Sequence, residues 1–308
     1  MANILVTGGA GFIASHLVDA LIAQGNEVTV IDDLSSGLRE YVNPQAAFVQ
    51  ASIGDPAIAD LFFQNSFDLV YHLAAQIDVR KSVADPMADN DINVRGAYNI
   101  LENCRKHKVR KLVFASTGGA IYGEADIVPT PEHYPASPLS PYGIHKFTFE
   151  KYLNYYHHVF GQDYTVLRFA NVYGPRQYKG GEAGVIAIFT DKAVAGEICT
   201  IFGDGLQTRD FVFVEDVVLA LLRAAEADFP GAINIGTGTE MTLLDVVSAI
   251  EKALGAKLSL EHAPAKLGEQ RRSALDNSLA QQVLGWSPQY NLDSGIARTI
   301  AWAKNRSV

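Results

Sequence analysis

The chain has 308 residues, of which 48% are hydrophobic and 19% are charged, and its formal net charge is -9. This composition predicts a soluble globular protein whose core is large enough for one large domain or two coupled domains. Because the balance is acidic and Lys and Arg form no long run, we expect neither a nucleic-acid partner nor an anionic membrane surface.

The cysteines and the lengths of the apolar runs exclude further classes of protein. Cys104 and Cys199 lie far apart and offer neither a metal-binding spacing nor a disulfide framework, so we expect no metal site. A strand pattern already begins at residue 3, which leaves no room for a signal peptide before it. No run of about 18 apolar residues occurs, as a membrane span would require. These features predict a cytoplasmic protein.

The predicted elements alternate along the first half of the chain. Residues 3–33, NILVTGGAGFIASHLVDALIAQGNEVTVIDD, have the pattern of a strand, a glycine turn, an amphipathic helix and a second strand. Further strands are predicted at AAFVQ, DLVYHLAA, KLVFAST and YTVLRFA, and further helices at PAIADLFF, at residues 86–108, and from Ser140 to about Gly161. This alternation predicts an α/β fold with a Rossmann-type doubly wound parallel sheet.

After Asn171 the sequence becomes richer in glycine and its elements become shorter, which predicts a smaller C-terminal substrate-binding lobe. The segments FVFVEDVVLALLRAAEA and GAINIG still have the pattern of a helix and a strand that could return to the main sheet. We therefore expect the two parts to be interleaved. The first would comprise residues 1–170 plus about 210–236, and the second would comprise residues 171–209 and 237–308.

The segment TGGAGFIA, at residues 7–14, lies directly between a predicted strand and a predicted helix. Gly8 and Gly11 fit a GxxGxxG spacing, with Ala14 in the third position. In that context backbone N–H groups can approach a pyrophosphate at the helix N-terminus, so the segment predicts dinucleotide binding. The alternative is a tight turn with a purely structural role.

Two carboxylates, Asp32 and Asp33, end the second predicted strand about 20 residues further on, where an acidic residue accepts hydrogen bonds from the adenosine ribose. A carboxylate there also repels a 2′-phosphate, which favours NAD over NADP. The alternative is that the pair only caps the loop that follows.

The segment SPYGIHK, at residues 140–146, opens a predicted helix with a serine cap and a proline at its first position. Tyr142 and Lys146 then lie on one face. An ammonium group nearby stabilises a phenolate, so a tyrosine with an ordinary pKa of about 10 could act as a base near neutral pH. The alternative is a chance pairing at this helical spacing.

Four further segments complete a pattern: HLAAQ at 72–76, Asn93, FASTGGAIYG at 114–123 and RFANVYGPRQ at 168–177. Together with the motifs above, they resemble the extended short-chain dehydrogenase/reductase family, and most closely its UDP-glucose (UDP-galactose) 4-epimerase branch. The motifs span nearly the whole chain in the family's order.

The resemblance implies an NAD cofactor, with Tyr142 as the catalytic base and Lys146 both tuning it and holding the nicotinamide ribose. A hydroxyl at the end of the fifth strand should complete the triad; Thr117 is favoured, with Ser116 nearer the nicotinamide. Ser52 stands where relatives often carry an aspartate that meets the adenine, so that contact should be weaker and Ile53 should act only through its backbone. The residues implied to contact NAD are Gly8, Gly11, Phe12, Ile13, Asp32, Asp33, Ser35, Ser36, Gly37, Ser52, Ile53, Leu73, Ala74, Ala75, Gln76, Asn93, Ser116, Tyr142 and Lys146.

For the UDP-sugar, the resemblance implies that Asn171 meets the diphosphate and that the segment TIFGDGLQTRDF closes over the uracil, with Phe202 in contact and Arg209 reaching a phosphate. In KLGEQRRSALDNS, at residues 266–278, Lys266 replaces the usual arginine and Glu269 would hold the uridine ribose. Lysine supplies a point charge in place of a bidentate fork. The remaining residues of interest there are Arg271 and Arg272, which could compensate or form a solvated charge cluster, and Ser273, which would stand beside an N-acetyl group.

The implied activity is NAD-dependent 4-epimerisation of a UDP-hexose through a 4-keto intermediate, extending to UDP-GalNAc and UDP-GlcNAc. A UDP-glucuronate 4-epimerase is an alternative, because Arg80, Lys81 and Arg176 could meet a carboxylate. Another nucleotide-sugar oxidoreductase and an NAD-sensing Rossmann protein also remain open. Dehydration is disfavoured, since Gly118 and Gly119 follow Thr117 where dehydratases carry an acid and a base.

Relatives commonly form homodimers through a four-helix bundle. Here the helices of that bundle would be residues 86–108 and 141–160. The alternative is that the apolar faces of these helices only cover the sheet.

Overall fold

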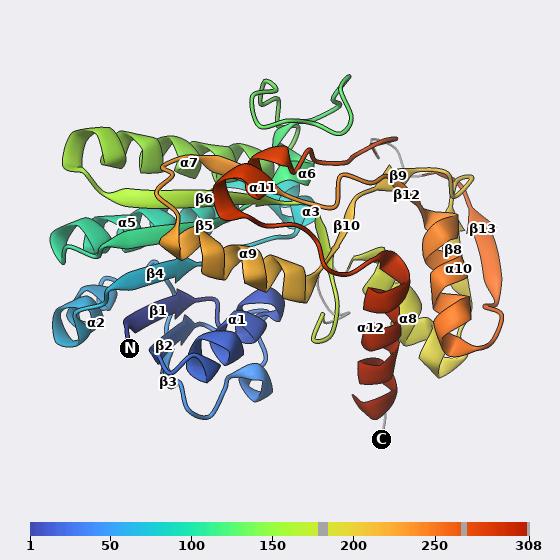
Figure 1. Cartoon of the computed structure of the whole chain (residues 1–308), viewed down its shortest axis with the longest axis horizontal. Coiled ribbons are helices and arrows are strands. Elements are labelled where there is room, and N and C mark those ends of the chain that lie inside the picture. The colour runs from blue at the N-terminus through green and yellow to red at the C-terminus, as the bar shows by residue number, and fades with distance from the viewer. Residues whose placement is uncertain (178–183, 266–269, 307–308) are drawn as a thin grey trace.

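The computed structural model describes residues 1–177, 184–265 and 270–306 (Figure 1). Its main feature is a parallel sheet of seven strands in the order β11-β6-β5-β4-β1-β2-β3. Their bounds are β1 Asn3–Thr7, β2 Glu27–Asp32, β3 Ala47–Gln50, β4 Leu69–His72, β5 Lys111–Thr117, β6 Asp163–Phe169 and β11 Ala232–Ile235. The order reverses direction between β1 and β4, so the carboxyl ends of these strands flank a crevice in which ligands of such folds bind.

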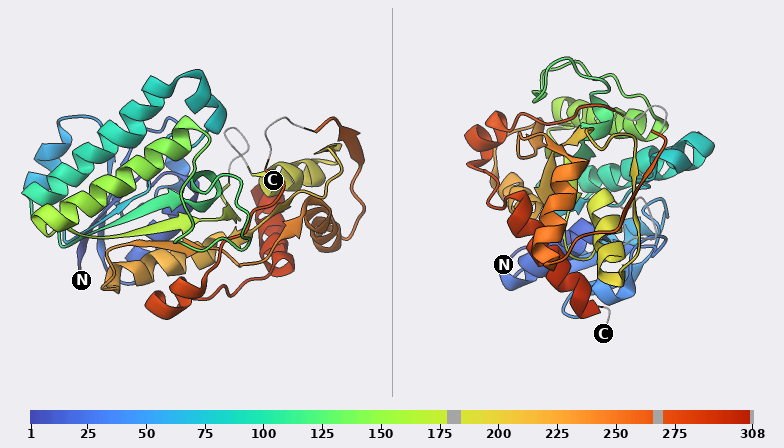
Figure 2. Two further views of the ribbon diagram at one scale, coloured as in Figure 1. Left: turned by 90° about the horizontal axis from the view of Figure 1, so that it is seen from above. Right: turned by 90° about the vertical axis from the view of Figure 1, so that its right-hand side faces the viewer.

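Helices cover both faces of the sheet, as seen in the left view of Figure 2. One face packs against α1 (Phe12–Ala23), α9 (Val214–Glu226) and α11 (Ser278–Leu284) around Leu17, Leu221 and Leu284. The other face packs against α2 (Ile58–Asn65), α5 (Ala97–Lys106) and α7 (Pro141–Phe160) around Phe62, Ile100 and Phe149. The predicted doubly wound Rossmann-type sheet is therefore confirmed.

The second lobe packs at the carboxyl ends of these strands around Phe189, Ile201 and Val246. A short parallel pair, β7 (Asn171–Tyr173) with β10 (Phe211–Phe213), leads from the sheet into it. Its other elements are α8 Val185–Ala195, β8 Cys199–Phe202, β9 Thr208–Arg209, β12 Met241–Thr242, α10 Leu243–Leu254, β13 Leu260–Ala263 and α12 Leu292–Arg306. Between these elements the chain returns to the main sheet twice, first through α9 and β11 and later through α11. The return of α9 and β11 was predicted, whereas α11 was expected in the second lobe.

The predicted helix from Ser140 to about Gly161 is confirmed as α7. The Ser140 hydroxyl oxygen accepts a hydrogen bond from the N–H of Gly143 at 3.2 Å, and Gly161 ends the helix in the left-handed conformation, with φ of 71°. Both capping signals involve residues close together in the chain, which is why the sequence predicts both ends of this helix.

The helix predicted over residues 86–108 is interrupted. It consists of α4 (Pro86–Asn90), a π-helical turn (Asp91–Gly96) and α5, which ends at Lys106. Gly96 in the turn lies so close to Ile53 that a β-carbon would stand 2.8 Å from its Cγ1. The remaining short elements are a 3₁₀ turn at Arg39–Tyr41, α3 Val79–Ala84 and α6 Gly118–Ile121.

Neither a membrane-spanning helix nor a metal-binding cluster occurs in the part of the chain that the structure describes. Over residues 1–177, 184–265 and 270–306, no helix combines the length and the apolar character needed to cross a membrane. Over the same ranges, no group of three or more His, Cys, Asp and Glu side chains is arranged to hold a metal ion.

Candidate functional site

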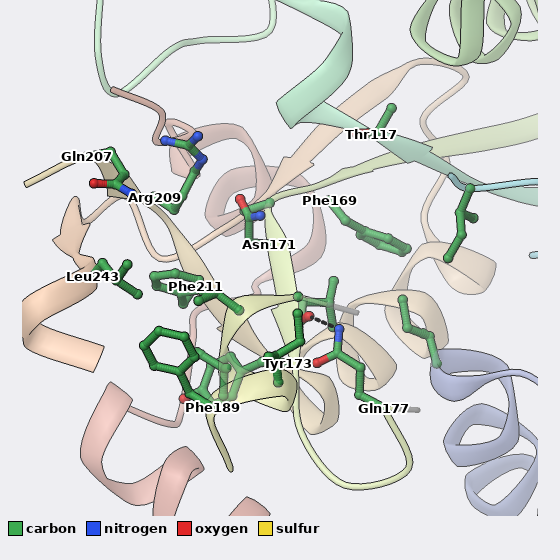
Figure 3. A pocket seen from close by; sticks show the side chains of 18 of the residues that line it. Thr117, Phe169, Asn171, Tyr173, Gln177, Phe189, Gln207, Arg209, Phe211 and Leu243 are labelled. Atoms are coloured by element: carbon green, nitrogen blue, oxygen red, sulfur yellow. Dashed lines mark hydrogen bonds between the residues drawn. The ribbon is translucent and has the colours of Figure 1, made fainter. Parts of the chain in front are cut away.

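A pair of adjoining cavities opens at the carboxyl ends of the strands. The first, which we call the glycine-turn cavity, has a volume of about 420 Å³ and runs past the N-terminus of α1. The second, the lobe cavity, has a volume of about 700 Å³ and lies between the sheet and the second lobe (Figure 3). Ser116, Tyr142 and Phe169 line both cavities, so Tyr142 stands where the two meet.

The glycine turn is shaped to let a ligand approach its backbone. Gly8 has φ of 74°, and a β-carbon there would lie 2.8 Å from the backbone of Ala74. Gly11 precedes the first turn of α1 and donates its N–H to the Gly8 carbonyl at 2.9 Å. Both glycines line the cavity together with Phe12 and Ile13. The N–H groups at the start of α1 are thus placed where an anion would be attracted.

Asp32 holds the turn and the following loop together. Its carboxylate accepts hydrogen bonds from the N–H of Ala10 at 3.0 Å and from the N–H of Leu34 at 2.8 Å. Burial raises the pKa of this carboxyl group. Asp33 instead accepts the N–H of Ser35 at 2.9 Å and does not line the cavity, as expected of a loop cap. Ser35, Ser36 and Gly37 do line it.

The loop after β4 supplies the opposite wall through Leu73 and Ala75. Gln76 and Asn93 do not line the cavity; they fix this loop. The Gln76 N–H donates to Asn93 Oδ1 at 3.1 Å, and Asn93 Nδ2 donates to the Gln76 carbonyl at 2.8 Å. Ala74 is fixed in the same way by the Thr7 hydroxyl, which accepts its N–H at 3.1 Å.

Two residues implied to contact the adenine lie elsewhere. Ser52 Oγ accepts the N–H of Gly54 at 3.3 Å, and the Ile53 side chain is buried against Gly96. Neither side chain lines the glycine-turn cavity. These positions agree with a weak contact at Ser52, and they leave the expected backbone contact of Ile53 as a prediction.

Lys146 is buried in α7, one helical turn after Tyr142. Its ammonium donates to the Ala115 carbonyl at 2.9 Å and lies 4.5 Å from the centre of the Phe114 ring. Burial lowers the pKa of Lys146 to about 7, while the nearby carboxylates of Asp89 and Glu150 oppose this decrease. Lys146 and Tyr142 both line the glycine-turn cavity, so the two residues of the motif share one site.

The structure separates the two hydroxyls at the end of β5. Ser116 Oγ donates to Glu150 Oε1 at 2.6 Å, whereas Thr117 lines the lobe cavity and accepts the N–H of Ala120 at 3.3 Å. Thr117 can therefore still donate its own hydrogen toward that cavity. This arrangement agrees with the preference for Thr117 on the substrate side.

Sequence reasoning missed the ion pair behind this site. Arg168 Nη2 lies 2.6 Å from Glu150 Oε2, and both side chains are only 7% exposed. Arg168 also donates to the Tyr122 hydroxyl at 2.8 Å. A signal for Glu150 was present, since it follows Lys146 by four residues and continues the Tyr142–Lys146 face.

Three of the residues expected at the substrate line the lobe cavity: Asn171, Phe202 and Arg209. Figure 3 shows Asn171 and Arg209 projecting toward the same space. Arg209 Nη1 donates to the carbonyls of Thr208 at 2.8 Å and Gln270 at 2.9 Å, which orients the guanidinium. An apolar wall of Tyr173, Phe189, Phe211 and Leu243 completes the cavity.

Several other candidates lie outside this cavity. Lys266 and Glu269 fall outside the described residues. Arg271 pairs with Asp204 at 2.9 Å on the surface, and the exposed Arg272 pairs with the half-buried Glu240 at 2.5 Å. These pairs match the charge-cluster alternative and do not support compensation for Lys266. Ser273 is half-buried and does not line the cavity.

The basic residues considered as partners of a uronate carboxylate do not lie where the sugar is expected to bind. Lys81 and Arg176 line the glycine-turn cavity, and Arg80 is exposed beside Asp78. None of the three lines the lobe cavity. Gly118 has no side chain that could act as an acid, and a β-carbon there would lie 2.5 Å from Leu275 Cδ1, so a larger residue would require Leu275 to move.

The glycine-turn cavity suits a dinucleotide on its own geometry. Its volume, the close backbone approach at Gly8 and the buried carboxylate of Asp32 match the needs of a pyrophosphate beside a ribose. Tyr41, Arg176 and Gln177 line the same cavity, and each has a buried polar atom without a partner among the described residues. A polar ligand would satisfy such atoms.

Comparisons with known proteins agree with this geometry. Residues 4–236 match the model of the NAD-dependent epimerase/dehydratase family. The chain is 45% identical over 309 residues to a UDP-glucose 4-epimerase of Mycolicibacterium smegmatis, covering 98% of this chain and 99% of that one. A UDP-glucose 4-epimerase of Thermotoga maritima, solved with UDP-glucose, superposes with a TM-score of 0.97 at 44% identity over 99% of this chain and 100% of that one. One from Thermus thermophilus, solved with NAD, gives 0.92 at 40% identity over 98% of each chain.

Proposed function

The chain belongs to the NAD-dependent epimerase/dehydratase family, and on that premise we propose that it interconverts UDP-galactose and UDP-glucose by inverting C4 of the hexose. It is an enzyme of the isomerase type that uses NAD. The observation that carries the proposal is the position of Tyr142, which lines both the glycine-turn cavity and the lobe cavity. A base at that junction meets a nucleotide-sugar on one side and a nicotinamide on the other.

Bound NAD would accept a hydride from C4 and return it to the opposite face of the resulting 4-keto sugar. Tyr142 would remove the proton of the C4 hydroxyl and return it after the sugar has turned over. Lys146, held by the Ala115 carbonyl, would stabilise the phenolate of Tyr142. Thr117 would donate a hydrogen bond to the sugar from the lobe-cavity side, while Asn171 and Arg209 would hold the diphosphate.

We favour a plain hexose over a uronate. The lobe cavity is lined by no arginine or lysine other than Arg209 and Lys192 among the described residues. Arg80, Lys81 and Arg176, which were considered as carboxylate partners, stand outside it. An NAD sensor is also disfavoured, because sensing has no use for a buried Lys146 one helical turn after Tyr142. Dehydration lacks an acid and a base next to Thr117.

We extend the proposal to UDP-N-acetylhexosamines on the family resemblance, which implies that a small residue, Ser273, stands beside the N-acetyl group. Ser273 does not line the lobe cavity, so this extension rests on the resemblance and not on the cavity. The Ser273→Tyr variant should lose activity on UDP-GlcNAc and keep activity on UDP-glucose. Equal activity of the variant on both substrates would contradict a position of Ser273 beside the N-acetyl group.

We also propose a cytoplasmic homodimer. The outer faces of α4, the π-helical turn, α5 and α7 expose Met87, Ile92, Tyr98, Ile144, Tyr152, Tyr155, Val159 and Phe160. A second copy of the same face would bury this apolar surface in a four-helix bundle. Light scattering should give about twice the chain mass, and a mass near 33.4 kDa would contradict the dimer. Both cysteines are free and buried, as suits a reducing compartment.

The decisive experiment is an NMR spectrum of UDP-galactose incubated with the purified protein and no added NAD. Appearance of the UDP-glucose anomeric signal would establish epimerisation with a retained cofactor. Absence of that signal, even after NAD is supplied, would overturn the proposed substrate.

A further inference from the structure

Unsatisfied polar atoms gather around one part of the glycine-turn cavity. Among the described residues, four side-chain polar atoms are buried without a hydrogen-bond partner: Tyr41 OH, Arg176 Nη1, Gln177 Oε1 and Thr190 Oγ1. The first three belong to residues that line the glycine-turn cavity. Because each such atom is costly when it stays unpaired, their clustering indicates the position of a polar ligand group.

Arg176 is held at this position by contacts on both sides. Its Nη2 lies 2.8 Å from Asp19 Oδ2 of α1, and its guanidinium lies 5.9 Å from the centre of the Tyr41 ring. His16, also on α1, donates from Nε2 to the Pro175 carbonyl at 2.9 Å. The loop that carries Arg176 is thus docked on the helix whose N-terminus borders the cavity.

The backbone of this loop is also unusual. Arg176 has φ of 68°, a left-handed conformation that a non-glycine residue adopts only at a cost in free energy. The next residue, Gln177, donates from Nε2 to the Val172 carbonyl at 3.2 Å, which leaves its Oε1 unpaired (Figure 3). The conformation therefore places two polar side chains at the cavity with one polar atom of each still available.

The chemistry of these groups favours a phosphate-bearing ligand. Arginine presents its donors as a planar fork, and here Asp19 occupies one arm while Nη1 remains without a partner. The same cavity is bordered by the N–H groups at the start of α1, which also favour an anion. A diphosphate between the helix N-terminus and the guanidinium would satisfy both.

We propose that Arg176 binds the diphosphate of the dinucleotide and that its ion pair with Asp19 holds the Gly174–Gln177 loop closed over it. This inference rests on the proposed use of NAD. Arg176 lines the glycine-turn cavity and not the lobe cavity, so its ligand is the dinucleotide and not the UDP-sugar. A charged contact that closes a loop slows cofactor release, as an enzyme that regenerates its cofactor in place requires.

The test compares fragments of the dinucleotide on the NAD-loaded protein. ADP, adenosine or adenosine 2′-phosphate is added to separate samples at increasing concentrations, and each sample is left until NAD release reaches equilibrium. Chromatography then gives the concentration of each fragment that displaces half of the NAD. The ratio of the adenosine value to the ADP value reports the preference for a diphosphate. Any change in NAD affinity cancels from this ratio. The matched control for Arg176→Gln is Arg95→Gln, which removes an exposed arginine paired with Asp91 on a different face.

In the Arg176→Gln variant, the preference for ADP over adenosine should fall about ten- to a hundredfold, the range for loss of a charged hydrogen bond. Arg95→Gln should leave it unchanged. Bound NAD that adenosine can still displace would also show that the site of the variant remains folded. An equal preference in the wild type and the Arg176→Gln variant would overturn the proposal, and so would a loss confined to adenosine 2′-phosphate, which would place the guanidinium at the ribose. These fragment ratios do not depend on epimerisation, so failure of the proposed activity would be recognised separately.

Discussion

Ser116 donates its hydroxyl hydrogen to Glu150 across 2.6 Å, and this bond commits the serine to the buried ion pair behind the active site. Thr117, the next residue, lines the lobe cavity, and its hydroxyl hydrogen is not committed to that ion pair. Adjacent residues of a strand point to opposite sides, so one hydroxyl serves the structure and the other is left for the substrate.

This relationship predicts different effects for two alanine substitutions. Thr117→Ala should lower kcat by about 10²–10³-fold, because it removes a donor aimed at the reacting sugar. Ser116→Ala should lower kcat far less and cost about 1 kcal/mol of stability, since Glu150 keeps its bonds to Arg168. Steady-state kinetics on UDP-galactose and urea unfolding measure the two effects. Thr117→Ser, which keeps the hydroxyl, is the control. A Ser116→Ala variant as inactive as Thr117→Ala would contradict the assignment.

The Glu150–Arg168 pair gives a second prediction. Glu150→Leu leaves the Arg168 guanidinium buried without its counter-charge and should lower the free energy of unfolding by about 3–5 kcal/mol. The double variant Glu150→Leu/Arg168→Leu removes both charges and should recover most of that loss, because no buried ion then lacks a partner. Denaturant titration of the single and double variants tests this. A double variant less stable than Glu150→Leu alone would show that the pair itself provides net stability.

A third prediction separates backbone strain from cofactor binding at the glycine turn. Gly8 and Gly25 have similar left-handed φ angles, 74° and 79°, but only Gly8 approaches another backbone closely. Both alanine substitutions should cost roughly 1–3 kcal/mol in strain. Only Gly8→Ala should also lose bound NAD, since its β-carbon would displace Ala74. The NAD released on heating each purified variant gives the comparison, and equal NAD content would contradict a role for the close approach at Gly8.

The sequence could predict the parts of this site that rest on local signals. The glycine turn, the Ser140–Pro141 helix start and the Tyr142–Lys146 spacing each lie within a few residues and reflect steric or helical rules. The structure places them as expected, at the end of β1 and in the first turns of α7.

The contacts that sequence reasoning missed join residues far apart in the chain. Glu150 meets Arg168 across a helix and a strand, and Leu275 fills the space beside Gly118. Asp210 accepts hydrogen bonds from the N–H groups of Thr237, Gly238 and Leu275. No periodicity encodes such meetings, because they depend on how the interleaved lobe packs onto the sheet.

The last prediction concerns pH and the buried His72. The Thr7 hydroxyl lies 2.7 Å from His72 Nδ1 and also accepts the Ala74 N–H, so a neutral imidazole has a hydrogen-bond partner in this buried position. Burial, together with the Lys146 charge, lowers the pKa of His72 to about 3. Below pH 6.5 the unfolded chain therefore takes up a proton that the folded protein does not, and stability decreases as the pH falls toward 3.

The slope of this loss is about 1.4 kcal/mol per pH unit, which amounts to roughly 2 kcal/mol by pH 5. Urea unfolding of the wild type and of His72→Gln at pH 7.5 and pH 5 measures it. The glutamine variant does not titrate in this range, so its stability should decrease less between the two pH values by about that amount. Comparing each protein with itself removes any cost of the substitution. An equal decrease in the two proteins would show that His72 is protonated in the folded state at pH 5.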